Sequence, residues 1–172
     1  MGADRPTPLV SLLVPADDAL ATAPNAHRFE PLDPERLARW DNFANWPDQT
    51  FFPTFIGIEK EEIRTDYCRL RLRYRPELNQ PAGVVHGGAL ATLVDTVVVP
   101  AVGAVYDTRP MLLTVSMNMN FLSAVREQDA VAEGWVERRG RSTVFCRAEV
   151  RSADGELALT ASLVYAVRFP ES

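Results

Sequence analysis

The second half of this chain alternates apolar and polar positions with a period of two, which is the pattern of half-buried β-strands. The clearest run is "TVSMNMNF", residues 114–121, whose apolar members predict one buried face: Val115, Met117, Met119 and Phe121. Three further runs, "VAEGWVE", "STVFCRAEV" and "LALTASLVYAV", are joined by the turn sequences "RRGR" and "DGE". In the last run the side chains predicted to point inward are Leu157, Leu159, Ala161, Leu163, Tyr165 and Val167. With "FIGIEKEEI" and "YCRLRLRY" earlier in the chain, the pattern predicts an antiparallel sheet.

A long apolar segment, "QPAGVVHGGALATLVDTVVVPAVGAV", interrupts this series at residues 80–105. Its length from about residue 88 to 105 approaches that of a membrane span. Asp95, Pro100 and Gly103 interrupt it, however, and the flanking strands need an apolar surface to cover. We therefore expect no membrane span but an α+β architecture: an antiparallel sheet of five to six strands wrapped around a long central helix, preceded by an N-terminal helical extension.

The N-terminal part of the chain differs in composition from the rest. Eight of the thirteen prolines fall at or before Pro53, and periodicity there is weak. This predicts an extension over residues 1–50 and a folded domain over residues 51–172. Within the extension, Asp33 suits an N-cap and Pro34 the first helical position. The apolar face of this predicted helix, which we expect to cover the core, consists of Leu37, Trp40 and Ala44.

Composition narrows the class of protein. A chain of 172 residues with 47% hydrophobic and 24% charged residues suits one globular domain, and a net charge of −5 argues against a nucleic-acid binder. Cys68 and Cys146 lie far apart in alternating stretches, which favours buried thiols in a reducing, cytoplasmic compartment. The stretch "ALATA" keeps a signal-peptide cleavage site open as an alternative, although prolines and aspartates interrupt the apolar run before it. His27 and His86 supply too few ligands for a transition metal.

Asp95 needs a reason to lie in a buried helix, because a desolvated carboxylate must find a partner or take up a proton. The string "QPAGVVHGG" of residues 80–88 has the spacing Q-x-x-G-x-x-H-G-G, and Asp95 follows nine positions after its histidine. Together with "TVSMNMNFLSA" after the helix, this constellation resembles the hotdog-fold acyl-CoA thioesterases of the PaaI-like group. The resemblance covers residues 54–168, about two thirds of the chain, and the predicted order of elements agrees with it.

The resemblance implies a role for each matching residue. Asp95 corresponds to the general base that activates water, or less often to the nucleophile. The backbone N–H of Gly87 corresponds to the donor that receives the thioester oxygen, and Gln80 to the residue that polarises this carbonyl or orders the water. His86 corresponds to a residue that more often orients the turn than transfers a proton. Thr114 lies where some relatives place a serine that helps to hold the water.

One departure from the family concerns the water-holding group. Some relatives carry a hydroxyl one turn after the acid, where this chain has Val99. Thr114 is the candidate replacement. Val99 and the long extension also keep a second hypothesis open, a non-catalytic acyl-CoA-binding or regulatory protein of the same fold. A dehydratase or hydratase is less favoured, because the chain lacks the His-Phe-Pro type motif of those relatives.

Elementary geometry adds a requirement for a second subunit. A helix N-terminus offers free N–H groups to an oxygen that gains negative charge, and the paired glycines Gly87 and Gly88 let a ligand approach the backbone closely. Asp95 lies eight residues further along the same helix, about 12 Å away at about 1.5 Å per residue. One subunit cannot readily use both groups on one carbon, so we expect a homodimer, or a dimer-of-dimers tetramer as in relatives.

The expected substrate is an acyl-CoA, with no separate cofactor and no metal. The turn residues Arg139, Gly140 and Arg141 could contact the coenzyme phosphates, although a solvated hairpin tip explains them equally well. The arginines that alternate along residues 69–73 are expected to face solvent. Met117 and Met119 are expected in the core. The sequence does not define the acyl group.

Overall fold

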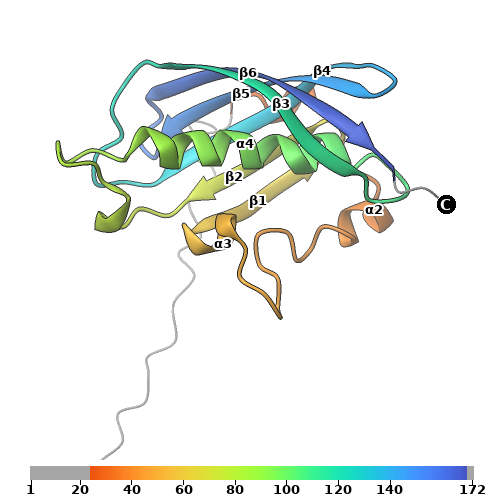
Figure 1. The fold of residues 1–172 in the computed structure, drawn as a ribbon, viewed down its shortest axis with the longest axis horizontal. Coiled ribbons are helices and arrows are strands. Elements are labelled where there is room, and N and C mark those ends of the chain that lie inside the picture. The colour runs from red at the N-terminus through yellow and green to blue at the C-terminus, as the bar shows by residue number, and fades with distance from the viewer. Residues whose placement is uncertain (1–23, 170–172) are drawn as a thin grey trace, which may run out of the picture.

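The computed structural model describes residues 24–169, in which a six-stranded antiparallel sheet curves around one long helix (Figure 1). The strand order is β1-β2-β4-β5-β6-β3. The strands are β1 (Ile58–Arg64), β2 (Tyr67–Leu72), β3 (Met111–Phe121), β4 (Ala130–Arg139), β5 (Thr143–Ser152) and β6 (Leu157–Arg168). The helices are α2 (Pro34–Ala38), α3 (Phe52–Phe55) and α4 (Gly87–Gly103), with short 3₁₀ turns at Ala26–Arg28 and Pro76–Leu78. The predicted sheet and central helix are therefore confirmed.

Helix α4 is the centre of the core. Its side chains Leu93, Val94 and Val97 are fully buried against the concave face of the sheet. The approach is closest at Gly134 of β4, where a Cβ atom would lie 2.7 Å from a methyl group of Val97. Glycine is therefore needed at this point for the helix to reach the sheet. None of the helices within residues 24–169 is long and apolar enough to cross a membrane.

Strand β3 forms an edge of the sheet and contains a bulge between Thr114 and Ser116. Before the bulge Thr114 pairs with Tyr165, and after it Met117 pairs with Leu163. Residues that pair directly share a face, so the bulge puts Thr114 on the same face as Met117 and Met119. The prediction that strict alternation separates Thr114 from the methionines is wrong for this reason.

The apolar face of β3 is not buried within one chain. Phe121 is 53% exposed and Met117 37%, whereas Met119 is half-buried; Val115, at the bulge, is 63% exposed. The expectation that Met117 lies in the core is therefore wrong for the single subunit. β3 is an edge strand with a neighbour on one side only, and α4 does not cover it fully. A face of this kind requires a further covering surface.

The extension packs on the domain, but its helix is shorter than predicted. Asp33 caps α2 as expected, accepting hydrogen bonds from the N–H groups of Glu35 and Arg36, and α2 ends at Ala38. Trp40 and Ala44 are buried outside any helix, and Ala44 adopts the left-handed conformation with φ of 64°. The predicted boundary at residue 50 stays a prediction, and the "ALATA" stretch lies outside the described residues.

The arginines of β2 also differ from expectation. Arg71 is 7% exposed and forms ion pairs with Glu61 and Asp129. Arg69 pairs with Glu61 as well, with N and O atoms 2.8 Å apart. The expectation that this row faces solvent is therefore wrong for Arg71. An acidic residue on each neighbouring segment supplies the partner that a buried guanidinium requires.

Candidate active site

The start of α4 presents an unpaired backbone donor. His86 is the N-cap, and its Nδ1 accepts a hydrogen bond of 2.8 Å from the N–H of Gly88. Gly87 is the first helical residue, so its N–H has no partner inside the helix. No other backbone or side-chain hydrogen bond within residues 24–169 uses that N–H either. The Gly87 N–H is therefore free to bind an acceptor, and His86 holds the turn that presents it.

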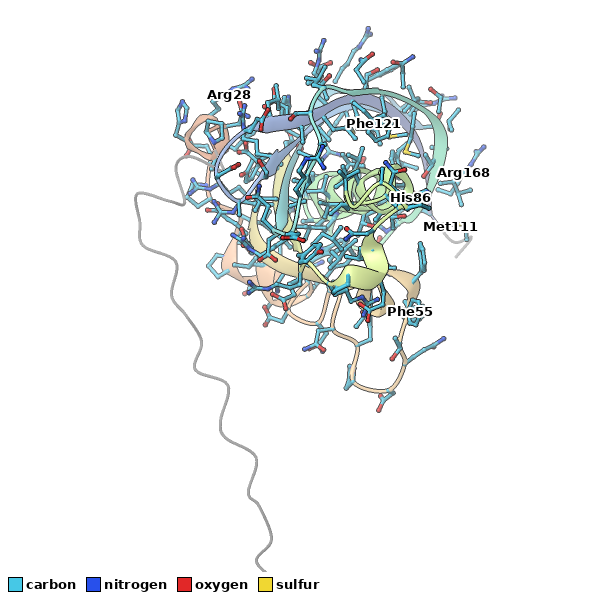
Figure 2. The ribbon with its side chains drawn as sticks, turned by 90° about the vertical axis from the view of Figure 1, so that its left-hand side faces the viewer. Arg28, Phe55, His86, Met111, Phe121 and Arg168 are labelled. Carbon is cyan, nitrogen blue, oxygen red and sulfur yellow. The ribbon has the colours of Figure 1, made fainter. Side chains whose placement is uncertain are left out.

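A tight turn brings Gln80 to the same place. The N–H of Gln80 donates to Val84 at 2.9 Å, and Gly83 adopts a positive φ of 75°, which glycine tolerates without strain. Gln80, Gly87 and Phe121 then line one cavity of about 380 Å³. Figure 2 looks along α4 from this end and shows His86 near the helix start with Phe121 on the sheet beside it. This cavity places an amide side chain near the free N–H.

Asp95 is half-buried in the middle of α4, and two hydroxyl groups hold its carboxylate. Thr114 donates to Oδ1 at 2.8 Å, and the Tyr165 hydroxyl also contacts Oδ1. The same hydroxyl lies 2.7 Å from the backbone oxygen of Asp95. Burial and the adjacent carboxylate raise the pKa of Tyr165, so this phenol stays protonated and donates. One carboxylate oxygen is thus fixed, and Oδ2 has no hydrogen-bond partner within residues 24–169.

The Gly87 N–H and the Asp95 carboxylate open into different cavities. Asp95 lines a cavity of about 480 Å³ together with Thr96, Val99, Arg109 and four residues of the segment before β1: Phe43, Trp46, Phe51 and Pro53. Gly87 and Gln80 do not line that cavity. The helical spacing of Gly87 and Asp95 within α4 explains the separation. Within the described part of one subunit, the donor and the carboxylate therefore face separate spaces.

The turn of residues 139–141, which we predict to contact the coenzyme phosphates, also makes contacts that stabilise the fold. Arg139 donates to Asp66, to the hydroxyl of Tyr106 at 3.1 Å and to the carbonyl of Ala101 near the end of α4. Gly140 closes the hairpin, its N–H bonded to Thr143 at 2.8 Å, and Arg141 is exposed. A contact of this turn with coenzyme phosphates stays a prediction, carried mainly by Arg141.

Sequence reasoning missed two residues of this region, Tyr165 and Arg109. The alternation in β6 correctly predicts that Tyr165 points inward, but not that its hydroxyl meets Asp95. Arg109 precedes β3 and carries no motif. No group of three or more His, Cys, Asp or Glu side chains in residues 24–169 could hold a metal ion.

Comparison with known proteins defines the class. Residues 82–159 match the family model of the thioesterase superfamily. Two Saccharolobus solfataricus proteins whose names describe them as esterases are 29% and 26% identical to this chain, over 62% and 66% of its length and 69% and 79% of theirs. The matched span contains Gly87, Asp95 and Thr114.

Solved structures show the same fold. The PaaI protein from the phenylacetic acid degradation operon of E. coli superposes with a TM-score of 0.66 at 15% identity, covering 77% of this chain and 90% of that one. The thioesterase HI1161 of Haemophilus influenzae gives a TM-score of 0.63 at 23% identity, covering 67% and 80%. The fold is thus the hotdog fold of thioesterases, as the resemblance predicts. Residues 82–159, somewhat less than half of the chain, are similar to the thioesterase superfamily, and this similarity suggests hydrolase activity.

Proposed function

We propose that this protein hydrolyses acyl-CoA thioesters at a site shared by two subunits of a homodimer. The observation that carries the proposal is the fixed carboxylate of Asp95. Two hydroxyl donors occupy Oδ1, Oδ2 has no hydrogen-bond partner within residues 24–169, and Asp95 lines a cavity, as a general base requires. The free N–H of Gly87 at a helix start supplies the complementary group for a developing oxyanion.

In the proposed reaction the thioester carbonyl oxygen accepts a hydrogen bond from the Gly87 N–H of one subunit, with Gln80 beside it. Asp95 of the partner subunit takes a proton from water, whose oxygen attacks the carbonyl carbon. The tetrahedral intermediate collapses, the C–S bond breaks, and the sulfur leaves with the proton as the thiol of CoA. The products are a free carboxylic acid and CoA. His86 keeps the helix start in place through Gly88.

The exposed face of β3 supports the dimer. Phe121 and Met117 are 53% and 37% exposed, and the strand has an open edge. Such an edge pairs readily with a second copy of itself, which would bury these side chains. Pairing through this edge would also bring a second α4 close to the first, because β3 packs beside α4. A dimer-of-dimers tetramer and a cytoplasmic location, favoured by the free buried thiols of Cys68 and Cys146, are part of the same proposal.

Replacing Asp95 by Asn tests the proposal. The amide keeps the size of the side chain but cannot accept a proton, so thiol release from a panel of acyl-CoAs should fall by at least about 100-fold. Asp107→Asn, which removes an exposed carboxylate paired with Arg36, is the matched control and should keep full activity. Circular dichroism checks the fold of both variants.

Undiminished thiol release by the Asp95→Asn variant would contradict the proposal. The same assay separates an enzyme from the alternative, a non-catalytic acyl-CoA-binding protein. A binding protein would retain acyl-CoA, as measured by calorimetry, while the wild type released no thiol above background. The long extension and Val99, which favour that alternative, have another explanation in the cavity beside Asp95.

A further inference from the structure

Four aromatic side chains of the segment before β1 form a continuous wall beside Asp95. Neighbouring ring centroids lie 5.4 Å apart for Trp40 and Phe43, 5.5 Å for Phe43 and Trp46, and 4.9 Å for Trp46 and Phe51. Tilted and edge-to-face pairs at these distances are favourable, so the wall is preformed rather than assembled by a ligand. Phe51 nevertheless remains 43% exposed. The residues that make this wall lie outside the span that matches the family model.

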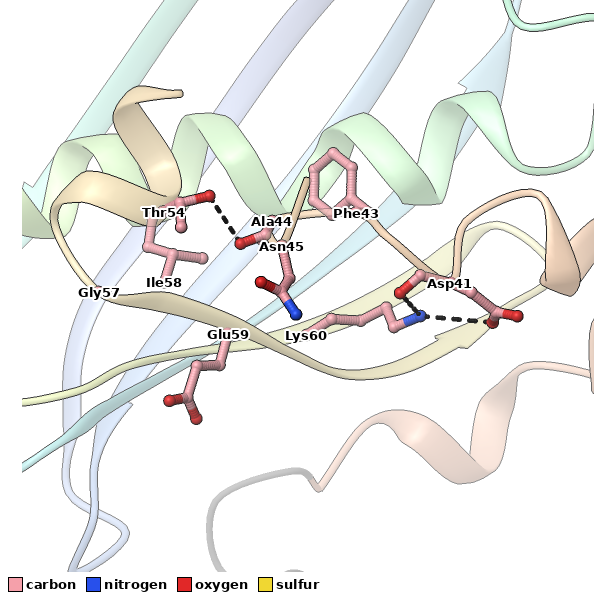
Figure 3. A pocket seen from close by; sticks show the side chains of 9 residues that line it. All are labelled: Asp41, Phe43, Ala44, Asn45, Thr54, Gly57, Ile58, Glu59 and Lys60. Atoms are coloured by element: carbon pink, nitrogen blue, oxygen red, sulfur yellow. Dashed lines mark hydrogen bonds and ion pairs between the residues drawn. The ribbon is translucent and has the colours of Figure 1, made fainter. Parts of the chain in front are cut away.

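Hydrogen bonds anchor the segment that carries the wall. Lys60 of β1 donates to the carbonyl of Trp40 at 2.9 Å and to that of Asp41 at 3.1 Å. Thr54 donates to the carbonyl of Ala44 at 2.7 Å. Figure 3 shows the contacts of Asp41 and Ala44 around a cavity of about 500 Å³ that contains neither Asp95 nor Gly87. These hydrogen bonds anchor the loop to β1 and α3, and its aromatic rings lie on the side of α4.

The space in front of the wall continues past Asp95 toward the end of α4. The cavity that contains Asp95 adjoins a second one of about 210 Å³, and both share Phe43, Trp46, Val99 and Arg109. At its far end Trp40 packs on Gly103, where a Cβ atom would lie 2.7 Å from the indole. Gly103 lies eight residues beyond Asp95, about 12 Å along the helix. The space is therefore elongated, apolar and of a size typical of small-ligand sites.

Arg109 provides the positive charge at the far end of this space. Its guanidinium carbon lies 4.8 Å from the centre of the Trp40 ring, and one nitrogen donates to the carbonyl of Arg39 at 2.9 Å. Within residues 24–169 no carboxylate lies within 4.0 Å of it. A guanidinium held in place beside an aromatic wall keeps further N–H groups for an anionic ligand, and carboxylate is the group its geometry fits best.

We infer that this space is the acyl subsite and that it selects acyl groups with an apolar body and a carboxylate at the far end. The inference rests on the proposed thioesterase function. In it the thioester lies at Asp95, the body of the acyl group packs on Trp46 and Phe51, and the distal carboxylate binds Arg109. Val99, which stands where some relatives carry a hydroxyl one turn after the acid, lines this subsite.

Matched thioester pairs test the inference: octanoyl-CoA against its ω-carboxylated counterpart, and benzoyl-CoA against 4-carboxybenzoyl-CoA. The wild type should show the higher kcat/KM with the carboxylated member of at least one pair. Arg109→Gln should lower that kcat/KM by about tenfold or more, as expected for a lost hydrogen bond to a charged group. It should leave the neutral esters within about twofold. Arg109→Lys should restore part of the preference, since it keeps the charge but loses the planar fork.

Trp46→Ala separates the contribution of the aromatic wall to substrate binding from that of the Arg109 charge. It should raise KM for both members of each pair, since it removes apolar contact from the body of the acyl group. An equal effect of Arg109→Gln on neutral and carboxylated esters would overturn the inference, because Arg109 would then bind the coenzyme or serve the fold. So would a wild type that prefers the neutral members of both pairs. If the wild type released thiol from none of the esters, the proposed function itself would fail.

Discussion

At the scale of single residues, the carboxylate of Asp95 is the feature around which the site is built. Thr114 and Tyr165 donate to the same oxygen, so the side chain has one orientation and one free oxygen. The resemblance predicts Thr114 at this place as a group that holds water. In the structure its hydroxyl instead meets the carboxylate, which makes it a positioning residue for the proposed base.

We predict that Tyr165→Phe lowers kcat by about tenfold or more while KM changes little. The phenol donates to the ionised carboxylate, and a hydrogen bond to a charged group contributes about 1.5–3 kcal/mol. Without it the carboxylate loses one of the two donors that fix its orientation. Steady-state kinetics provide the measurement.

Tyr67→Phe is the matched control for this variant. Tyr67 is also a buried tyrosine that donates to a carboxylate, that of Glu133 at 2.9 Å, but it does not contact Asp95. It should lower stability without lowering kcat. An unchanged kcat in Tyr165→Phe, or the same fall in both variants, would show that Tyr165 serves only the fold.

The sequence predicts Asp95 and Gly87 as site residues but does not predict their surroundings. The motif fixes residues that are close in the chain, and the alternation in β6 predicts which way Tyr165 points. A period of two gives the face of a strand, however, and not the neighbour across the fold. Tyr165 meets a residue 70 positions away, and no local pattern encodes that contact.

At the scale of secondary-structure elements, β3 and the extension show where local patterns fail. The alternation of "TVSMNMNF" predicts the strand correctly, but the bulge after Thr114 puts this residue on the same face as Met117 and Met119. In the extension, the helical spacing of Leu37, Trp40 and Ala44 predicts a helix, but the helix in the structure already ends at Ala38. Packing of Trp40 on Gly103 and the left-handed turn at Ala44 take precedence over weak helical propensity.

The start of the described extension is tied to the sheet by a buried carboxylate, which gives a pH-dependent prediction. Glu133 of β4 accepts hydrogen bonds from the backbone and side chain of Asn25, each at 3.0 Å. Burial raises its pKa by more than these bonds and that from Tyr67 lower it. The folded state therefore binds the proton more tightly than the unfolded chain. This contribution to stability is fully present below the ordinary pKa of 4.5 and is lost as pH rises through the raised value.

Glu133→Gln removes this titration. The free energy of unfolding of the variant relative to the wild type should therefore increase between pH 4.5 and pH 8, as measured by urea denaturation at several pH values. Glu137→Gln, at an exposed position of the same strand, serves as the control for removal of a carboxylate. A difference between variant and wild type that stays constant or shrinks with pH would contradict the assignment.

At the scale of the whole molecule, the subunit separates the parts that its chemistry needs. The proposed oxyanion donor and the proposed base lie on one helix but open into different cavities, and the apolar face of β3 remains uncovered. Dimerisation through β3 would bring the Gly87 N–H of one subunit toward Asp95 of the other, and it would cover the apolar face of β3. Helical spacing in the sequence is enough to predict the need for a second subunit, because it depends only on the rise per residue of an α-helix.

The most direct measurement of this central claim uses hybrid dimers of two inactive variants. Gly87→Pro removes the donor N–H with little effect on the helix, because proline suits the first helical position and His86 already has the extended conformation that a residue before proline requires. Gly87→Ala is its control, since it adds a Cβ atom near Phe121 but keeps the N–H. Loss of one oxyanion donor is expected to lower the rate by about 10²- to 10³-fold.

Dimers that combine one Asp95→Asn subunit with one Gly87→Pro subunit can be isolated by tandem affinity tags and assayed for thiol release. If each site takes its donor from one subunit and its base from the other, every hybrid contains one intact site and should show about half of the wild-type activity. Hybrids that form but remain as inactive as their parents would contradict the shared site.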